Sequence, residues 1–142
     1  MATTRSASTH WEGTLFEGAG ETTFASSGIG TFPVSWPARA EESNGKTSPE
    51  ELIAAAHSAC FSMAFSGALA KNETPAAGLD VTAEVDFVPG TGITEIRLKV
   101  VGNVPGIDEE TFAKLADGAK SGCPVSQALA SVPSITLDAS LA

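Results

Sequence analysis

The sequence is poor in basic residues and in cysteine. It has 8 Lys and Arg against 17 Asp and Glu, a net charge of −9 at pH 7, and only two cysteines. No basic stripe appears anywhere, so no nucleic-acid partner is expected, because binding to a phosphate backbone depends on clustered cations. The N-terminal stretch MATTRSASTHWEG lacks an apolar core of signal-peptide length, and we expect a cytoplasmic protein.

Long apolar runs and recognisable ligand sets are also missing. The most apolar region, residues 54–69, is interrupted by His57, Ser58, Ser62 and Ser66. It is predicted to be too short and too polar for a membrane span, which needs about 20 apolar residues, so no membrane partner is expected. The two Cys and two His stand at no zinc spacing, and no phosphate-binding loop or GxSxG motif occurs. The sequence therefore predicts neither a metal site nor a cofactor.

The remaining residues predict one α+β domain over residues 1–142, long enough for a sizeable core. Period-two alternation of apolar and polar side chains indicates strands with one wet face, a habit of antiparallel sheets. The predicted elements are a hairpin in 8–26, an edge strand Thr31–Arg39 with two prolines, a long helix Thr47–Leu69, a hairpin of 79–88 and 93–102, a helix 109–120, a short helix after Cys123 and a last strand 134–142.

The start of the long helix is well marked. Ser48 suits the N-cap, Pro49 the first helical position, and Glu51 completes a capping box. Glu50 is not part of this capping box. The helix is apolar on nearly every side, so a sheet, other helices or a second subunit must cover it.

The chemistry of Cys60 and Cys123 has two interpretations. In a cytoplasmic protein two cysteines point away from a structural disulfide and towards redox chemistry, but two buried, inert thiols fit the composition as well. Cys123 precedes Pro124 at a helix start, a setting that lowers a thiol pKa. Cys60 lies mid-helix, where burial raises it. To react, Cys60 needs a positively charged side chain close to its sulfur, and Arg39 and His57 are the candidates. A histidine in a helix, however, is more often packed or solvated.

Glu50 and Cys60 cannot meet within one helix. They are ten residues apart, about 15 Å along the axis at about 1.5 Å per residue. Two copies of the helix, packed antiparallel in a dimer, would bring each Glu50 end near the other copy's Cys60. The same arrangement would cover the apolar helix.

The segment TSPEELIAAAHSACFSMA, with GIDEETF and AKSGCPVSQAL further along, resembles the OsmC/Ohr family of organic hydroperoxide reductases, and is nearest to its OsmC branch. The resemblance runs from HWEG at His10 to the last strand, ITLDASL. It implies an OsmC-like intertwined homodimer, in which antiparallel sheets wrap two central long helices and two active sites lie at the interface.

The resemblance also implies roles for four residues. Cys60 is the expected peroxidatic cysteine, which attacks an organic hydroperoxide and becomes a sulfenic acid. Cys123 is the resolving cysteine, which forms a Cys60–Cys123 disulfide that an external dithiol, of the lipoyl type in this family, reduces. Arg39 and Glu50 are the pair that polarises the thiolate. Local context favours Cys123 as the more acidic thiol, but we follow the family, because a nearby cation can override burial at Cys60.

A non-catalytic alternative stays open at this point. In it, a dimeric binding module holds an apolar ligand between its helices, and both cysteines are merely buried. Slow, unselective thiol titration and no disulfide after peroxide treatment would favour that alternative.

Overall fold

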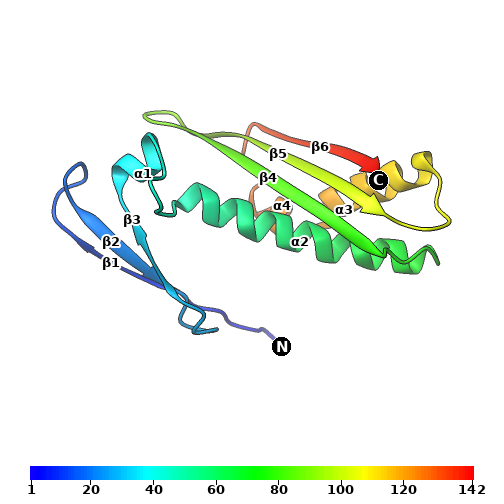
Figure 1. Cartoon of the computed structure of the whole chain (residues 1–142), viewed down its shortest axis with the longest axis horizontal. Helices are drawn as coiled ribbons and strands as arrows, with labels where there is room; N and C mark the ends of the chain where they lie inside the picture. The colour runs from blue at the N-terminus through cyan, green and yellow to red at the C-terminus, as the bar shows by residue number, and fades with distance from the viewer. The chain divides into compact units, whose positions relative to one another are not determined.

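The computed structural model describes all 142 residues, which fall into two compact units, Met1–Leu52 and Ile53–Ala142. Figure 1 labels their helices and strands in chain order. Each unit is described by itself below. The single domain expected over residues 1–142 and the intertwined dimer both stay predictions.

The first unit contains a three-stranded antiparallel sheet. Its strands β1 (Ser8–Glu12), β2 (Ala19–Thr23) and β3 (Thr31–Val34) lie in the order β1-β2-β3. The hairpin expected in residues 8–26 is therefore confirmed. Threonine hydroxyls join the strands in pairs, one at 2.8 Å between β1 and β2 and one at 2.9 Å between β2 and β3.

The strand expected over Thr31–Arg39 is too long. It ends at Val34, and Trp36–Ala40 forms a short helix, α1. Ser35 caps this helix by accepting a hydrogen bond from the backbone N–H of Ala38, and a proline occupies its first turn. An N-cap serine followed by proline is a helix start signal, which outweighed the extended character of the segment. Arg39 consequently lies on a helix and not on a strand.

The long helix α2 spans Pro49–Lys71 and continues from the first unit into the second. Ser48 caps it as expected, accepting a bond from the Glu51 backbone, while the Glu51 carboxylate bonds to the Thr47 hydroxyl. With 23 residues the helix is long and apolar enough to cross a membrane by length and composition, so the prediction that it is too short and too polar is wrong. Its many alanines, together with leucine, phenylalanine and methionine, give this apolar composition, and core helices of soluble proteins can have the same length and composition.

The second unit contains a sheet in the order β4-β5-β6, built from β4 (Gly78–Val88), β5 (Gly92–Asn103) and β6 (Ser134–Leu141). The β4–β5 hairpin is antiparallel, as expected. β6 runs parallel to β5, so the prediction of antiparallel sheets is wrong for this strand. The helices α3 (Glu109–Gly122) and α4 (Pro124–Ala128) explain the difference, since a parallel neighbour requires a long crossover connection.

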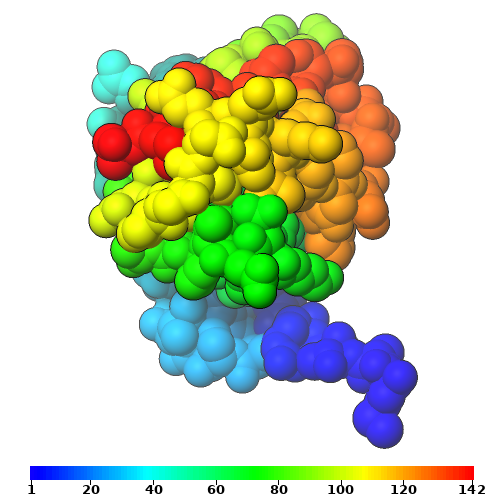
Figure 2. All heavy atoms as spheres, turned by 90° about the vertical axis from the view of Figure 1, so that its right-hand side faces the viewer, coloured from blue at the N-terminus to red at the C-terminus, as the bar shows by residue number.

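The core of the second unit lies where α2, the sheet and α3 meet. Its central contact is the ring pair Phe65–Phe112, with centroids 5.0 Å apart. Figure 2 shows α3, in yellow to orange, directly against the end of α2, in green. The buried members are Phe61, Phe65, Leu69, Leu98, Val100, Val104, Phe112, Ala116 and Ala119.

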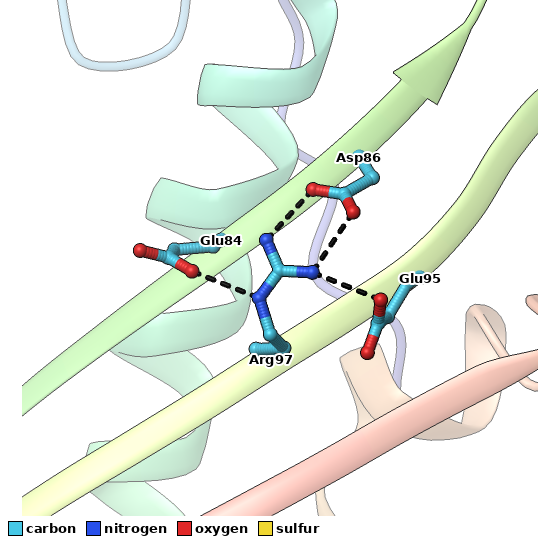
Figure 3. A network of polar contacts seen from close by, with 4 residues as sticks. All are labelled: Glu84, Asp86, Glu95 and Arg97. Atoms are coloured by element: carbon cyan, nitrogen blue, oxygen red, sulfur yellow. Dashed lines mark hydrogen bonds and ion pairs between the residues drawn. The ribbon is translucent and has the colours of Figure 1, made fainter.

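The outer face of the β4–β5 hairpin carries a four-residue ionic cluster, which we call the Arg97 cluster (Figure 3). Arg97 bonds to Asp86 at 2.7 Å, to Glu84 at 2.9 Å and to Glu95 at 3.0 Å. The strand register places all four side chains on one face, because Glu84 lies opposite Arg97 and Asp86 opposite Glu95. This is the wet face that the alternation of β4 and β5 predicted.

Candidate active site

Arg39 and Glu50 form a tight ion pair in the first unit. The Nε of Arg39 lies 3.0 Å and 3.2 Å from the two carboxylate oxygens of Glu50, and its Nη2 lies 2.9 Å from Oε1. Glu50 is only 6% exposed. A buried carboxylate needs a partner of opposite charge, and two nitrogens of a planar guanidinium hold it in one orientation.

The helix start leaves Glu50 available for this contact. Ser48 caps the helix and Glu51 bonds to Thr47, so the Glu50 side chain is not needed for either contact at the helix start. Its place in the first turn of α2 also suits a carboxylate, because the helix dipole is positive there. The two residues that the sequence proposed as a polarising pair are therefore in direct contact.

Arg39 also borders a hollow of about 380 Å³ within the first unit. Most of its lining is apolar, from Trp11, Leu15, Val34, Trp36 and Leu52. Sequence reasoning missed this hollow. Its side chains come from all three strands of the first unit, from α1 and from the start of α2. The signal for α1 was the Ser35 cap, in a segment that we interpreted as a strand.

Cys60 and Cys123 form the second pair, within the second unit. Their sulfur atoms lie 2.7 Å apart although the residues are 63 positions apart in the chain, and both thiols are free. Cys60 is half-buried in the middle of α2, and Cys123 is fully buried at the junction of α3 and α4. The structure thus brings the two sequence-predicted cysteines into contact.

The surroundings of the two sulfurs differ in their effect on pKa. Burial raises the pKa of Cys60, and the contact with Cys123 raises it further. Burial also acts to raise the pKa of Cys123, but interactions with Cys60, with the backbone and hydroxyl of Ser126, and with the Val125 backbone outweigh it and lower that pKa. In the pair, Cys123 is therefore the more acidic thiol, as its position at a helix start predicted.

His57 does not supply a cation to Cys60. Its ring is completely buried, its Nε2 lies 2.6 Å from the Ser126 hydroxyl oxygen, and burial lowers its pKa, which keeps it neutral. Of the two candidate cations for Cys60, only Arg39 remains. Sequence reasoning did not identify Ser126 as its partner, because nothing in the chain signals that these two residues, 69 positions apart, meet.

The four predicted residues thus form two contacts, Arg39 with Glu50 and Cys60 with Cys123. Each contact lies within its own unit, and the approach of Arg39 to Cys60 stays a prediction. No group of three or more His, Cys, Asp or Glu side chains is placed to hold a metal ion. Chemically, the second contact offers two adjacent thiols of unequal acidity, an arrangement suited to forming a reversible disulfide.

Known proteins match the chain over most of its length. The profile of the family described as OsmC-like protein matches residues 42–138. Peroxiredoxin OsmC of Escherichia coli (strain K12) is 44% identical over 132 residues, which cover 91% of this chain and 90% of that protein. The organic hydroperoxide resistance protein of Xanthomonas axonopodis pv. citri is 31% identical over 94 residues, covering 64% of this chain and 65% of that protein.

Solved structures show the same fold. The organic hydroperoxide resistance protein OsmC from Legionella pneumophila aligns with a TM-score of 0.72 and 24% identity, over 100% of this chain and 98% of that one. The mixed α+β arrangement of two small sheets and helices is therefore shared with that protein.

Proposed function

We propose, given that the chain belongs to the OsmC-like protein family and is a cysteine-based peroxidase, that it reduces organic hydroperoxides to alcohols through Cys60 and Cys123. The observation that carries the mechanism is the 2.7 Å distance between the two sulfurs. A sulfenic acid formed on either sulfur has the other thiol within immediate reach. We therefore prefer a peroxidase function to the alternative of a non-catalytic binding module.

In the first step the Cys60 thiolate attacks an oxygen of the hydroperoxide. The O–O bond breaks, the leaving alkoxide takes up one proton to become the alcohol, and Cys60 becomes a sulfenic acid. Because burial raises the pKa of Cys60, the thiolate needs a positive charge nearby. Arg39 is the proposed source, and its bonds to Glu50 fix the plane of the guanidinium.

In the second step Cys123 condenses with the sulfenic acid. Water is released and a Cys60–Cys123 disulfide forms, which protects Cys60 from further oxidation. An external dithiol then reduces the disulfide by exchange through a mixed disulfide. Family resemblance favours a lipoyl-type dithiol for this step.

The apolar hollow beside Arg39 supports an organic substrate rather than hydrogen peroxide. Tryptophan and aliphatic side chains line it, and they offer an alkyl or aryl group a dry surface. The names of the relatives agree, since the Xanthomonas and Legionella proteins are both called organic hydroperoxide resistance proteins.

The proposed enzyme works as a cytoplasmic homodimer with active sites at the interface. Within one helix, Glu50 and Cys60 are separated by about 15 Å, from ten residues at about 1.5 Å each. The Arg39–Glu50 pair of one subunit therefore serves Cys60 of the other. Native mass measurement tests this assembly, and a monomer would contradict it.

Turnover of cumene hydroperoxide with a dithiol tests the proposed chemistry. We expect Cys60→Ser to abolish turnover, because it removes the attacking sulfur. Cys123→Ser should keep the first attack but let Cys60 proceed to sulfinic and sulfonic acids, seen by mass spectrometry. Full turnover in Cys60→Ser would contradict the proposal. Loss of the first attack in Cys123→Ser would invert the two roles.

A further inference from the structure

His57 is a buried polar side chain that the peroxidase chemistry leaves unexplained. Its ring is 0% exposed, it bonds through Nε2 to the Ser126 hydroxyl at 2.6 Å, and its Nδ1 is buried without a hydrogen-bond partner. Most buried polar atoms have a partner, and leaving one unpaired is unfavourable. An apolar side chain would fill the same place without this penalty.

The hydrogen-bond partners of the neutral ring favour one position for its single proton. A buried N–H without an acceptor is rarer than a buried acceptor without a donor. The unpaired Nδ1 therefore carries the lone pair, and Nε2 carries the hydrogen and donates it to the Ser126 oxygen. The hydroxyl hydrogen of Ser126 must then point away from His57, towards another acceptor.

Cys123 is the acceptor that the start of α4 places beside Ser126. It is the N-cap residue of that helix and Ser126 is the third helical residue, and side chains at these two positions face each other. Ser126 is itself buried, at 8% exposure, and follows Cys123 by three residues in the first turn of α4. Interactions of its backbone and its hydroxyl with Cys123 lower the pKa of that thiol.

We propose that His57 and Ser126 are positioning residues for disulfide formation: His57 Nε2–H fixes the Ser126 hydroxyl so that its hydrogen points to the Cys123 sulfur and stabilises the attacking thiolate. The inference rests on the proposed function and adds the control of its second step. The titratable groups next to the His57–Ser126 pair are Cys60 from α2 and Cys123 from the α3–α4 junction. Neither ring nitrogen of His57 bonds to a charged group.

The step balances without a further reactant. Cys123 gives up its proton, its sulfur electron pair forms the S–S bond, and the S–O bond of the Cys60 sulfenic acid breaks. The oxygen leaves as hydroxide and takes up one proton to become water. One sulfur is oxidised and the other is reduced, while His57 and Ser126 end with the protons they began with.

A single-turnover experiment separates the two chemical steps. The full-length reduced protein is mixed with one equivalent of cumene hydroperoxide, quenched at intervals, and analysed by mass spectrometry for sulfenic acid and disulfide. We expect Ser126→Ala to form the sulfenic acid at the normal rate and the disulfide about tenfold to a hundredfold more slowly, the effect of one hydrogen bond to a charged group. Its rate profile should shift to higher pH by about one unit or more.

Ser126→Thr keeps the hydroxyl and should restore the rate of disulfide formation. Ser62→Ala is the matched control, because it removes a partly buried serine hydroxyl from α2 that bonds only to a backbone carbonyl of its own helix. We expect this variant to behave as the unaltered protein in both steps.

Two variants of His57 distinguish a donor from a packing role. His57→Gln retains an N–H donor near the Nε2 position, whereas His57→Leu retains the apolar volume. We expect Gln to keep most of the rate of disulfide formation and Leu to lose it as Ser126→Ala does. A packing role predicts the reverse order, so this pair decides the matter even if Ser126→Ala does not fold.

The failures of the two proposals look different. If hydroperoxide oxidises neither cysteine of the unaltered protein, the proposed function is wrong, and this inference is wrong with it. If the first step is normal and Ser126→Ala forms the disulfide at the unaltered rate and pH profile, only the role of His57 and Ser126 is overturned. Leu outperforming Gln at position 57 would overturn it as well.

Discussion

Two arginines bond to carboxylates in this protein, and their surroundings differ. Arg39 bonds to Glu50, whose side chain is 7% exposed, at the edge of an apolar hollow. Arg97 bonds to three carboxylates, Glu84, Asp86 and Glu95, whose side chains are 67%, 43% and 38% exposed. The first contact has a buried carboxylate and is balanced in charge, while the second is an exposed cluster with one cation and three anions.

The Arg97 cluster contains shifted pKa values but is not the better candidate for function. Hydrogen bonds from Arg97 lower the pKa of Asp86, and the carboxylates, Asp86 first, raise the pKa of Arg97. Yet a thiolate approaching Arg97 would meet an excess of negative charge, and no cysteine belongs to the cluster. Structural ion networks shift pKa values too, so a large pKa shift does not by itself mark a functional site.

The largest expected contrast between the two arginines is in catalysis. We expect Arg39→Ala to lower the rate of Cys60 oxidation by cumene hydroperoxide about a hundredfold at neutral pH, because a nearby cation lowers a thiol pKa by about 1–3 units. The rate should recover as the pH rises, since the thiolate then forms without help. Stopped-flow measurement over a range of pH checks both expectations.

Arg97→Ala is the matched control, since it removes the same side chain from the other unit. We expect it to leave the rate of Cys60 oxidation unchanged. Arg39→Lys should fall in between, because an ammonium keeps the charge but not the paired N–H contacts to Glu50. A slow Arg97→Ala variant, or a normal Arg39→Ala variant, would contradict the assignment of Arg39.

A smaller contrast is expected between the carboxylates. Glu50→Gln keeps the shape of the side chain but removes the charge that orients Arg39, and we expect about a tenfold lower rate, the effect of one weakened charge-assisted bond. Glu84→Gln is the control and should react normally. Equal rates in these two variants would mean that Glu50 does not orient Arg39 for the reaction.

The smallest expected effect concerns acid stability. Arg97 lowers the folded-state pKa of Asp86 below its usual value of 3.8. The ionised carboxylate therefore stabilises the fold above about pH 4, and this contribution is lost as the pH falls through the lowered pKa. Urea unfolding at neutral and at acidic pH should show a slightly smaller loss of stability in Arg97→Ala than in the unaltered protein. A larger loss in the variant would reverse the sign that we assign.

Most elements that depend on residues close together in the sequence were predicted correctly. The Ser48 cap, the alternation in β4 and β5, and the turn between them all identified structures that formed as expected. The sequence also identified Arg39, Glu50, Cys60 and Cys123, and the structure joins these residues in two contacts. The sequence motifs around these residues are the basis of the family resemblance, and the resemblance implies their roles.

Features that depend on distant parts of the chain were not predictable. The parallel direction of β6 follows from the α3–α4 crossover, and its alternation is the same for either direction. The contact of His57 with Ser126 joins two elements whose meeting no local pattern encodes. The helix α1 is a different case, because its Ser35 cap was visible in the sequence, but prolines suggested an interrupted strand.

The long separation of the two cysteines has a consequence for the energetics of the catalytic cycle. A disulfide between residues 63 positions apart restricts the unfolded chain, and chain-entropy arguments assign such a loop a stabilisation of about 4 kcal/mol. The oxidised enzyme of the proposed cycle is then the more heat-resistant form, and reduction returns it to a looser chain. Each turnover would carry the protein through two levels of thermal stability, so peroxide exposure itself would protect the enzyme against unfolding.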